Sequence, residues 1–304
     1  MERRYNDYNT YLKSLFGQRV QKIVIDAGLS CPNRDGTLAG NGCIYCNSSG
    51  SGSGAFSRGL SIREQVAQGR TAMIRRYKAA RFLAYFQSYT NTYTTVEHMK
   101  AMIDEAIDAD GMVGFAMGTR PDCIDDGKLG LMAGYADRYL VWIEYGLQSV
   151  HDVTLKKINR GHDFACFERA VAMTRNRGIN ICAHVILGLP GETRDMMLDS
   201  ARVLGGLGVH GVKIHLLYVI KGTPLAVMHG AGHYRCMEQE AYVETVCDFL
   251  ERLPESIIIQ RLTGDPHPDE LIAPQWSRRK TETFAMIQSC LEARNTRQGR
   301  LYGV

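Results

Sequence analysis

The sequence has no long apolar run. Its 304 residues are 45% hydrophobic and 22% charged, but no apolar stretch reaches the roughly 18 residues that a membrane-spanning helix needs. The N-terminal segment, MERRYNDYNTYLKSLF, lacks the apolar core that precedes the cleavage site of a secretory signal. These absences argue against membrane insertion and secretion, so we expect a cytoplasmic protein with no membrane partner.

The chain also lacks a low-complexity linker that would divide it into independent domains. Its length allows one large α/β domain or two small ones. Its net charge of +4 is weakly basic, which permits an acidic partner such as RNA without requiring one. We therefore expect one domain, with a C-terminal extension packed on it.

Short apolar runs alternate with longer segments of helical periodicity. The expected strands are 22–26, 82–87, 113–117, 140–145, 179–187 and 212–218. The expected helices are 62–77, 96–109, 128–136, 164–177 and 193–207. This alternation predicts parallel βαβ units in an α/β fold. An open doubly wound sheet and a full or partial (β/α) barrel both satisfy it, and both place chemistry at the carboxyl ends of the strands.

The pattern changes after residue 218. Residues 221–235 are loop-like, 237–253 and 277–294 have helical periodicity, and 256–261 is a seventh strand candidate. We therefore expect a core domain over residues 1–220 and a small C-terminal extension over 221–304.

Nine cysteines stand in a chain without a secretory signal, which favours metal binding or buried thiols over disulfides. Only three are clustered: Cys31, Cys43 and Cys46 follow the first strand with the spacing C-x11-C-x2-C. The other six are scattered singly, as expected of small buried residues; they are Cys123, Cys166, Cys182, Cys236, Cys247 and Cys290.

The cysteine cluster lacks a fourth ligand nearby. A structural zinc site is normally closed by four ligands, and a ferredoxin cluster also takes four thiolates. Three thiolates leave one metal corner open, as a catalytic cluster requires. Zinc with a distant fourth ligand, in a non-enzymatic RNA-binding module, stays open as an alternative.

Motifs along the chain resemble one family. They are CPNRDGT with CIYCN, then AYFQSYTNTY, GTRPDC, EYGLQS with NRGHDF, HVILGLPGET, KGTPL and QRLTGD with APQW. Together they resemble the radical SAM superfamily, in particular the YhcC/YtqA-type family, which is related to the radical SAM domain of the elongator catalytic subunit. The resemblance covers roughly residues 5–302. The usual spacing in the superfamily is C-x3-C-x2-C, so the long first gap is a departure.

The resemblance implies a partial (β/α)6 barrel whose Cys31, Cys43 and Cys46 bind a [4Fe-4S] cluster. The cluster would cleave S-adenosylmethionine (SAM) to a 5′-deoxyadenosyl radical. An electron donor such as flavodoxin or ferredoxin would be a partner. The residues expected to contact SAM are Tyr45, Glu144, Gln148, Ser149, Arg160, His184, Gly188, Pro190 and Gly191.

Several of these residues also have a physical interpretation. A carboxylate at Glu144, inside an apolar strand, is costly unless it meets a cation, either the SAM ammonium or a structural partner. Arg160 follows Gln148 by twelve positions, a separation similar to that in oxygen-independent coproporphyrinogen oxidases, and can hold a carboxylate through two hydrogen bonds. His184 stands where relatives carry an aspartate for the ribose hydroxyls, although a buried structural histidine is an equal alternative.

The substrate residues are less well defined. No Gly-Gly-Glu motif ends the second strand, which leaves Gln87, Ser88 and Glu144 as candidates for the SAM amine. Gln87, Arg120, His215 and Lys221 lie at or near strand ends and are the candidate catalytic residues. Packing is an equal alternative for each of them.

The elongator-type resemblance points to the wobble uridine of tRNA. The chain leaves no room for an acetyltransferase domain, so we expect modification of an existing C5 side chain; a small-molecule or protein substrate is the alternative. Basic residues that could contact RNA are Arg75, Arg76, Lys78, Arg81, Arg278, Arg279, Lys280, Arg294, Arg297 and Arg300. Tyr89, Tyr93 and Trp276 could stack on a base or belong to the core.

Overall fold

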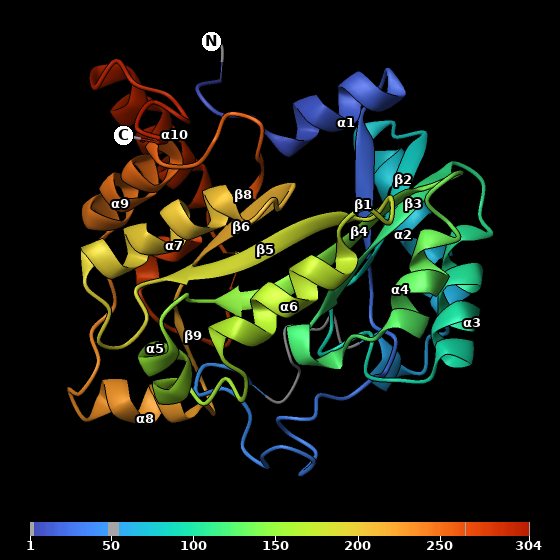
Figure 1. Ribbon diagram of the computed structural model, residues 1–304, viewed down its shortest axis with the longest axis horizontal. Helices are drawn as coiled ribbons and strands as arrows, with labels where there is room; N and C mark the ends of the chain where they lie inside the picture. Colours follow the sequence, from blue (N-terminus) through green and yellow to red (C-terminus); the bar gives the residue numbers. More distant parts are fainter. Residues whose placement is uncertain (1–2, 48–54, 265, 304) are drawn as a thin grey trace.

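Seven parallel strands form one curled sheet, an open half-barrel (Figure 1). The computed structural model describes residues 3–47, 55–264 and 266–303. In spatial order the strands are β1 (Val20–Ile25), β2 (Arg81–Phe86), β3 (Met112–Thr119), β4 (Leu140–Gln148), β5 (Asn180–Leu187), β6 (Gly211–Leu216) and β8 (Ile258–Arg261). A separate antiparallel pair joins β7 (Val219–Ile220) to β9 (Leu271–Ala273). The α/β partial barrel predicted from the sequence is therefore confirmed.

The helices mostly connect these strands. They are α1 (Tyr8–Phe16), α2 (Ile62–Tyr77), α3 (Val96–Ile107), α4 (Asp126–Ala133), α5 (Asp152–Lys157), α6 (Phe164–Thr174), α7 (Arg194–Gly206), α8 (Pro224–Gly230), α9 (Gln239–Glu251) and α10 (Lys280–Ala293). Three 3-10 helices, η1 (Phe56–Arg58), η2 (Pro121–Cys123) and η3 (Gln275–Arg278), complete the described elements. None of the described helices is long and apolar enough to cross a membrane.

The expected elements are present with small shifts at their ends. Helix α2 has the predicted bounds and begins with a capping box, in which Ser61 and Glu64 each accept a hydrogen bond from the other's backbone N–H. One expectation needs correction. Residues 221–235, expected as a loop, contain α8, which starts on Pro224 after a Thr223 cap. The seventh strand expected over 256–261 is present as β8 and pairs with β6 in the same sheet.

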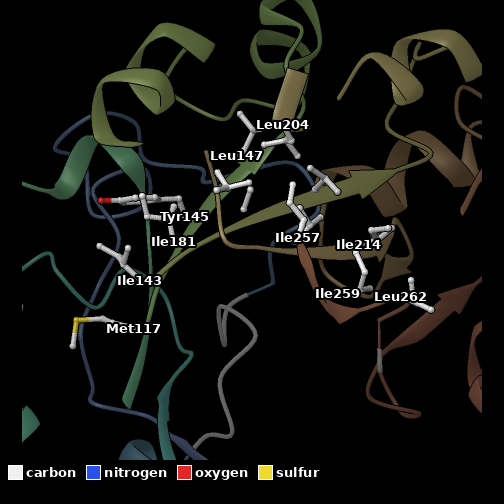
Figure 2. Close-up of a cluster of buried hydrophobic side chains, with 14 of the residues drawn as sticks. Met117, Ile143, Tyr145, Leu147, Ile181, Leu204, Ile214, Ile257, Ile259 and Leu262 are labelled. Carbon is white, nitrogen blue, oxygen red and sulfur yellow. The ribbon is translucent and has the colours of Figure 1, made fainter. Parts of the chain in front are cut away.

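The outer face of the sheet carries the main core. On β4, alternation sends Ile143, Tyr145 and Leu147 outward, and each is fully buried. Figure 2 shows these side chains beside Ile181 of β5 and Leu204 of α7. This packing fixes the register of β4 and so determines which of its residues face into the barrel.

The inner face of β4 carries Trp142, Glu144 and Gly146 instead. At the amino-terminal end of the barrel, α1 packs Tyr8 edge-on against Trp142, with their ring centroids 5.7 Å apart. Figure 1 shows α1 at one end of the molecule, and the loop after β1 together with α8 at the other. The carboxyl ends of the strands, where the sequence motifs lie, therefore face the loop that carries the cysteines.

Candidate functional site

The three clustered cysteines lie on the loop that follows β1. The Cys46 N–H donates to the carbonyl of Cys43 at 3.0 Å, and the Arg34 N–H donates to the carbonyl of Cys31 at 2.8 Å. Gly42 adopts φ +66°, a left-handed conformation that glycine accommodates readily. Burial and the neighbouring Cys43 thiolate raise the pKa of the Cys46 thiol, and the Arg34 side chain donates to its sulfur at 3.4 Å. The loop thus holds three thiols and brings an N–H donor to one of their sulfurs.

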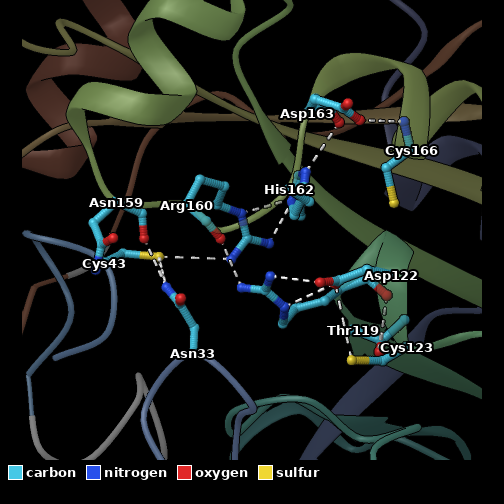
Figure 3. Close-up of polar contacts among 12 residues, drawn as sticks. Asn33, Cys43, Thr119, Asp122, Cys123, Asn159, Arg160, His162, Asp163 and Cys166 are labelled. Atoms are coloured by element: carbon cyan, nitrogen blue, oxygen red, sulfur yellow. Dashed lines mark hydrogen bonds and ion pairs between the residues drawn. The ribbon is translucent and has the colours of Figure 1, made fainter. Parts of the chain in front are cut away.

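Side-chain hydrogen bonds attach this loop to the segment after β4 (Figure 3). Asn33 is fully buried and donates through Nδ2 to the carbonyl of Asn159 at 2.7 Å and to the Cys43 sulfur at 3.6 Å. Asn159 donates in return to the carbonyl of Gly42 at 2.6 Å. The sequence analysis missed both asparagines, although each belongs to a quoted motif, CPNRDGT or NRGHDF.

Arg160 connects the cysteine loop to the end of β4. Its Nη2 and Nε donate to the carbonyl of Gly146 at 2.6 and 3.2 Å, and its Nη1 donates to the Cys43 sulfur at 3.7 Å. Burial lowers the pKa of Arg160, but the neighbouring Cys43 and Tyr45 raise it by more than burial lowers it. The net shift is upward, so the guanidinium stays charged. A Cβ on Gly146 would lie 2.6 Å from Arg160 Nη2 and 2.8 Å from Gln148 Nε2. The predicted pair, Gln148 and Arg160, is therefore brought together over a glycine.

Arg120 supports Arg160 from the end of β3. Its guanidinium is 2% exposed, holds Asp122 through two hydrogen bonds of 2.8 and 2.7 Å, and donates to the carbonyl of Arg160 at 2.8 Å. Burial and the two neighbouring arginines lower the pKa of His162 to about 3, so its imidazole is neutral. Arg120, a candidate for substrate contact, is thus occupied in positioning the segment that carries Arg160.

The Gly-Leu-Pro-Gly-Glu turn after β5 lines a cavity of about 350 Å³, to which Gly188, Pro190 and Gly191 all contribute. Ser149, fully buried, donates to the Glu192 carboxylate at 2.5 Å. Thr193 then caps α7 by accepting from the Met196 N–H. The turn therefore leads into α7, close to the helix expected over 193–207, and borders the cavity.

Glu144 meets its cation within the chain. Its carboxylate is fully buried and pairs with Lys213 of β6 in a very close contact, with Lys22 of β1 at 3.4 Å and with His184 at 2.9 Å. Of the two alternatives for this carboxylate, the structure favours the structural salt bridge over the SAM ammonium. His184 Nε2 forms a hydrogen bond with the Glu144 carboxylate, and burial lowers the pKa of His184 to about 4. Both observations fit the alternative of a structural histidine.

The remaining candidates are dispersed. Lys221 is exposed beyond β6, whereas the His215 ring lies 5.4 Å from that of His184. Gln87 follows β2 and borders a second cavity. Trp276 is 8% exposed, its ring lies 5.5 Å from that of Tyr242 in a tilted contact, and it donates to the carbonyl of Met237, so it belongs to the core. Among the scattered cysteines Cys123, Cys182 and Cys247 are buried, and the other three are partly buried.

Sequence reasoning also missed Lys213. Its ammonium is 2% exposed and lies between Glu144 and the Tyr85 hydroxyl, which accepts its hydrogen bond at 2.9 Å. The signal was available: Lys213 interrupts the apolar strand VKIHL as Glu144 interrupts VWIEYG. Two opposite charges, each costly when buried alone, predict each other as partners.

The donor set of the loop suits an iron–sulfur cluster. Within the described ranges no three His, Cys, Asp or Glu side chains converge on one point as ligands of a single metal ion. A four-iron cluster takes each thiolate on a different iron, so its ligands need not converge. Three thiols with neighbouring N–H donors match that chemistry better than a closed zinc site.

Comparisons with known proteins identify the family of the chain. Residues 37–204 match the family model described as Radical SAM superfamily, and residues 209–293 match the Radical_SAM C-terminal domain. Uncharacterized protein YtqA of Bacillus subtilis (strain 168) is 40% identical over 99% of this chain and 94% of its own length. Protein YhcC of Escherichia coli (strain K12) is 39% identical over 91% of this chain and 88% of its own.

More distant matches include elongator-type proteins. The tRNA uridine(34) acetyltransferase of Methanocaldococcus infernus is 24% identical over 50% of this chain and 29% of its own length. The solved structure of the archaeal Methanocaldococcus infernus Elp3 superposes with a TM-score of 0.72 and 16% identity, covering 92% of this chain. This chain covers 64% of that solved chain, which has an N-terminal deletion (1–46), and the similarity shows the fold alone. On the family model and the full-length relatives, the chain belongs to the radical SAM superfamily of enzymes, in a YhcC-type family related to Elp3.

Proposed function

We propose that Cys31, Cys43 and Cys46 bind a [4Fe-4S] cluster, and that the chain uses it to cleave SAM and modify the C5 side chain of a wobble uridine in tRNA. When bound, the cluster supplies the electron that cleaves SAM to the 5′-deoxyadenosyl radical. The observation that carries the proposal is the loop of three thiols, which Asn33 and Arg160 attach to the end of β4.

The residues around the loop offer complementary groups to SAM. The Arg160 guanidinium has five N–H groups and uses three of them within the chain, which leaves donors for a carboxylate. Asn33 Oδ1 is buried, and no hydrogen-bond partner for it occurs in the described part of the chain. An unpaired buried acceptor is costly, and an ammonium group would satisfy it. The cavity beside Gly188 and Gly191 suits the adenine end.

The tRNA half of the proposal rests on charge and on the names of relatives. A relative over half the chain is called a tRNA uridine(34) acetyltransferase. Arg278 is exposed at the end of η3 and begins the basic run Arg278, Arg279 and Lys280. Arg294 and Arg297 are less available, because they pair with Asp248 at 2.7 Å and Glu255 at 2.9 Å.

Mass analysis of tRNA nucleosides tests the substrate directly. A strain of the source organism that lacks this protein should accumulate a wobble uridine with an unfinished C5 side chain, and the wild-type gene should restore the finished nucleoside. A gene carrying Cys43→Ala should not restore it. Unchanged wobble uridines in the deletion strain would rule out the tRNA substrate. They would not bear on SAM cleavage, which 5′-deoxyadenosine formation tests separately.

A further inference from the structure

A cavity of about 460 Å³ opens where the half-barrel does not close, between its edge strands β1 and β8. Lys22 and Val24 of β1 form one wall, and Gln260 and Arg261 of β8 form the other. Lys213 also lines it from inside the barrel. None of the three cysteines and none of the residues of the Gly-Leu-Pro-Gly-Glu turn contributes to this cavity.

The side chains that line the cavity carry more positive than negative charge. Lys22 and Lys213 both pair with the carboxylate of Glu144. Lys22 lies 3.4 Å from it, and Lys213 is in closer contact. At the rim, Arg3 is already neutralised by Asp7 at 2.8 Å. Arg261 has neither an ion pair nor a side-chain hydrogen bond within the described ranges, although it is only partly exposed. Lys22, Lys213 and Arg261 therefore stand beside one carboxylate, and Arg19, which lies over the Tyr77 ring at 5.0 Å, adds an exposed cation to the same lining.

This excess of charge is energetically expensive in the absence of a ligand. Burial lowers the pKa of Lys213 to about 7 although Glu144 raises it, and the charges of Lys22 and Arg261 lower it further. Like charges held together in a partly dry cavity repel one another more strongly than they would in water. A cleft lined by one sign of charge concentrates ions of the opposite sign.

The neutral groups of the cavity also offer donors. Gln260 accepts from Lys22 through Oε1 at 2.9 Å, while its Nε2 has no partner among the described residues. The Tyr8 hydroxyl, from α1 on the same cavity, is likewise buried without a partner in that part of the chain. Cations and N–H or O–H groups without acceptors together favour an oxyanion over a cationic or apolar ligand.

We propose that the cavity between β1 and β8 binds the carboxylate or phosphate group of a small organic ligand. Arg261 is its principal cationic contact, with Lys22 and Lys213 beside it, and Glu144 is the counter-charge that holds Lys213 in place. The cavity volume falls in the range of about 300–1,000 Å³ that small-molecule sites occupy. Gln87 also borders the cavity, but none of the three clustered cysteines lines it, so binding there can be tested without SAM cleavage.

Thermal unfolding of the full-length, anaerobically reconstituted protein, without SAM, tests the proposal. Sodium phosphate and sodium acetate serve as probes, each compared with sodium chloride at equal ionic strength. We expect one or both oxyanions to raise the unfolding midpoint by about 2–4 °C. Arg261→Gln should lose most of that rise, while Arg169→Gln, an exposed arginine on α6, should keep it. Phosphate also stabilises proteins in general, and that effect should be equal in the two variants. Comparing Arg261→Gln with Arg169→Gln therefore isolates the contribution of the site.

The stability of Arg261→Gln in chloride is the second measurement. Without a bound oxyanion, Arg261 repels the neighbouring lysines, so replacing it should cost no stability. The unfolding midpoint of this variant should therefore equal or exceed that of the wild type. Arg261→Lys should retain part of the oxyanion effect. A rise with acetate alone indicates a carboxylate ligand, and one with phosphate alone a phosphorylated ligand. No rise with either, or an equal rise in Arg261→Gln, would overturn the proposal.

Discussion

Arg160 and Cys43 are neighbours inside the fold although 117 positions separate them, with Nη1 of the arginine 3.7 Å from the cysteine sulfur. The same guanidinium holds the carbonyl of Gly146 at 2.6 Å. One side chain thus links the cysteine loop to the carboxyl end of β4. The position of this guanidinium relative to the thiols depends on the absence of a side chain at residue 146.

Gly146→Ala should therefore displace Arg160. The new Cβ would lie 2.6 Å from Nη2, closer than real contacts allow. We expect 5′-deoxyadenosine formation from SAM to fall by about tenfold or more, as when roughly 1.4 kcal/mol of positioning is lost. The control is Gly130→Ala in α4, where the Cβ would meet nothing within 4 Å. It should leave activity unchanged and stabilise the helix by about 0.5–1 kcal/mol. Wild-type activity in Gly146→Ala would contradict this role for the glycine.

The ion pair between Lys213 and Glu144 makes a prediction about stability. Lys213→Met removes the very close contact and leaves the buried Glu144 carboxylate with the longer contact to Lys22 and the hydrogen bond from His184. We expect a loss of about 3–5 kcal/mol in the free energy of unfolding, measured by urea denaturation.

The double variant Glu144→Gln with Lys213→Met removes both charges together. It should recover part of the loss, since no uncompensated carboxylate remains buried. If the two single effects simply add in the double variant, the two groups do not interact as the geometry indicates.

The fold at large could be predicted from the sequence, because apolar strands and amphipathic helices alternate with clear periods. Strands β1 to β6, helix α2 and the turn that opens α7 all lie near their expected positions. The short helix α8 was missed, since it spans seven residues between turns and has too few residues to show a period.

The site was predictable in part. Spacing singled out the three clustered cysteines, which lie on one loop. The twelve-residue separation linked Gln148 with Arg160, and both side chains lie beside Gly146. The pairing of Glu144 with Lys213 was missed, although each charge interrupts an apolar strand, because the two strands are separated in the sheet by β5 and the residues meet only when the sheet curls. Asn33 is similar: its contacts with Cys43 and Asn159 depend on how the loop folds back over the end of β4.

His184 predicts how stability changes with pH. Burial lowers its pKa to about 4 from an ordinary value of 6.5. Between these two values the unfolded chain binds a proton that the folded chain does not, so stability should fall as the pH decreases from 6.5 toward 4. We expect His184 to account for a loss of about 1–2 kcal/mol between pH 6.5 and pH 5.

Urea denaturation at those two pH values measures the effect. His184→Asn cannot titrate and should lose less stability on acidification than the wild type. His98→Asn, at an exposed position of α3, should behave like the wild type. An identical pH dependence in wild type and His184→Asn would show that this imidazole is not held neutral.

The cysteine loop is the basis of the whole account, and SAM cleavage after anaerobic reconstitution tests it most directly. With dithionite as reductant, the wild type should contain iron and sulfide in about equal amounts and should form 5′-deoxyadenosine from SAM. Alanine at Cys31, Cys43 or Cys46 should abolish that product while circular dichroism shows the fold intact, and Cys290→Ala should keep it. A wild-type protein with about one zinc per chain and no sulfide, or 5′-deoxyadenosine formed by Cys43→Ala, would contradict the account.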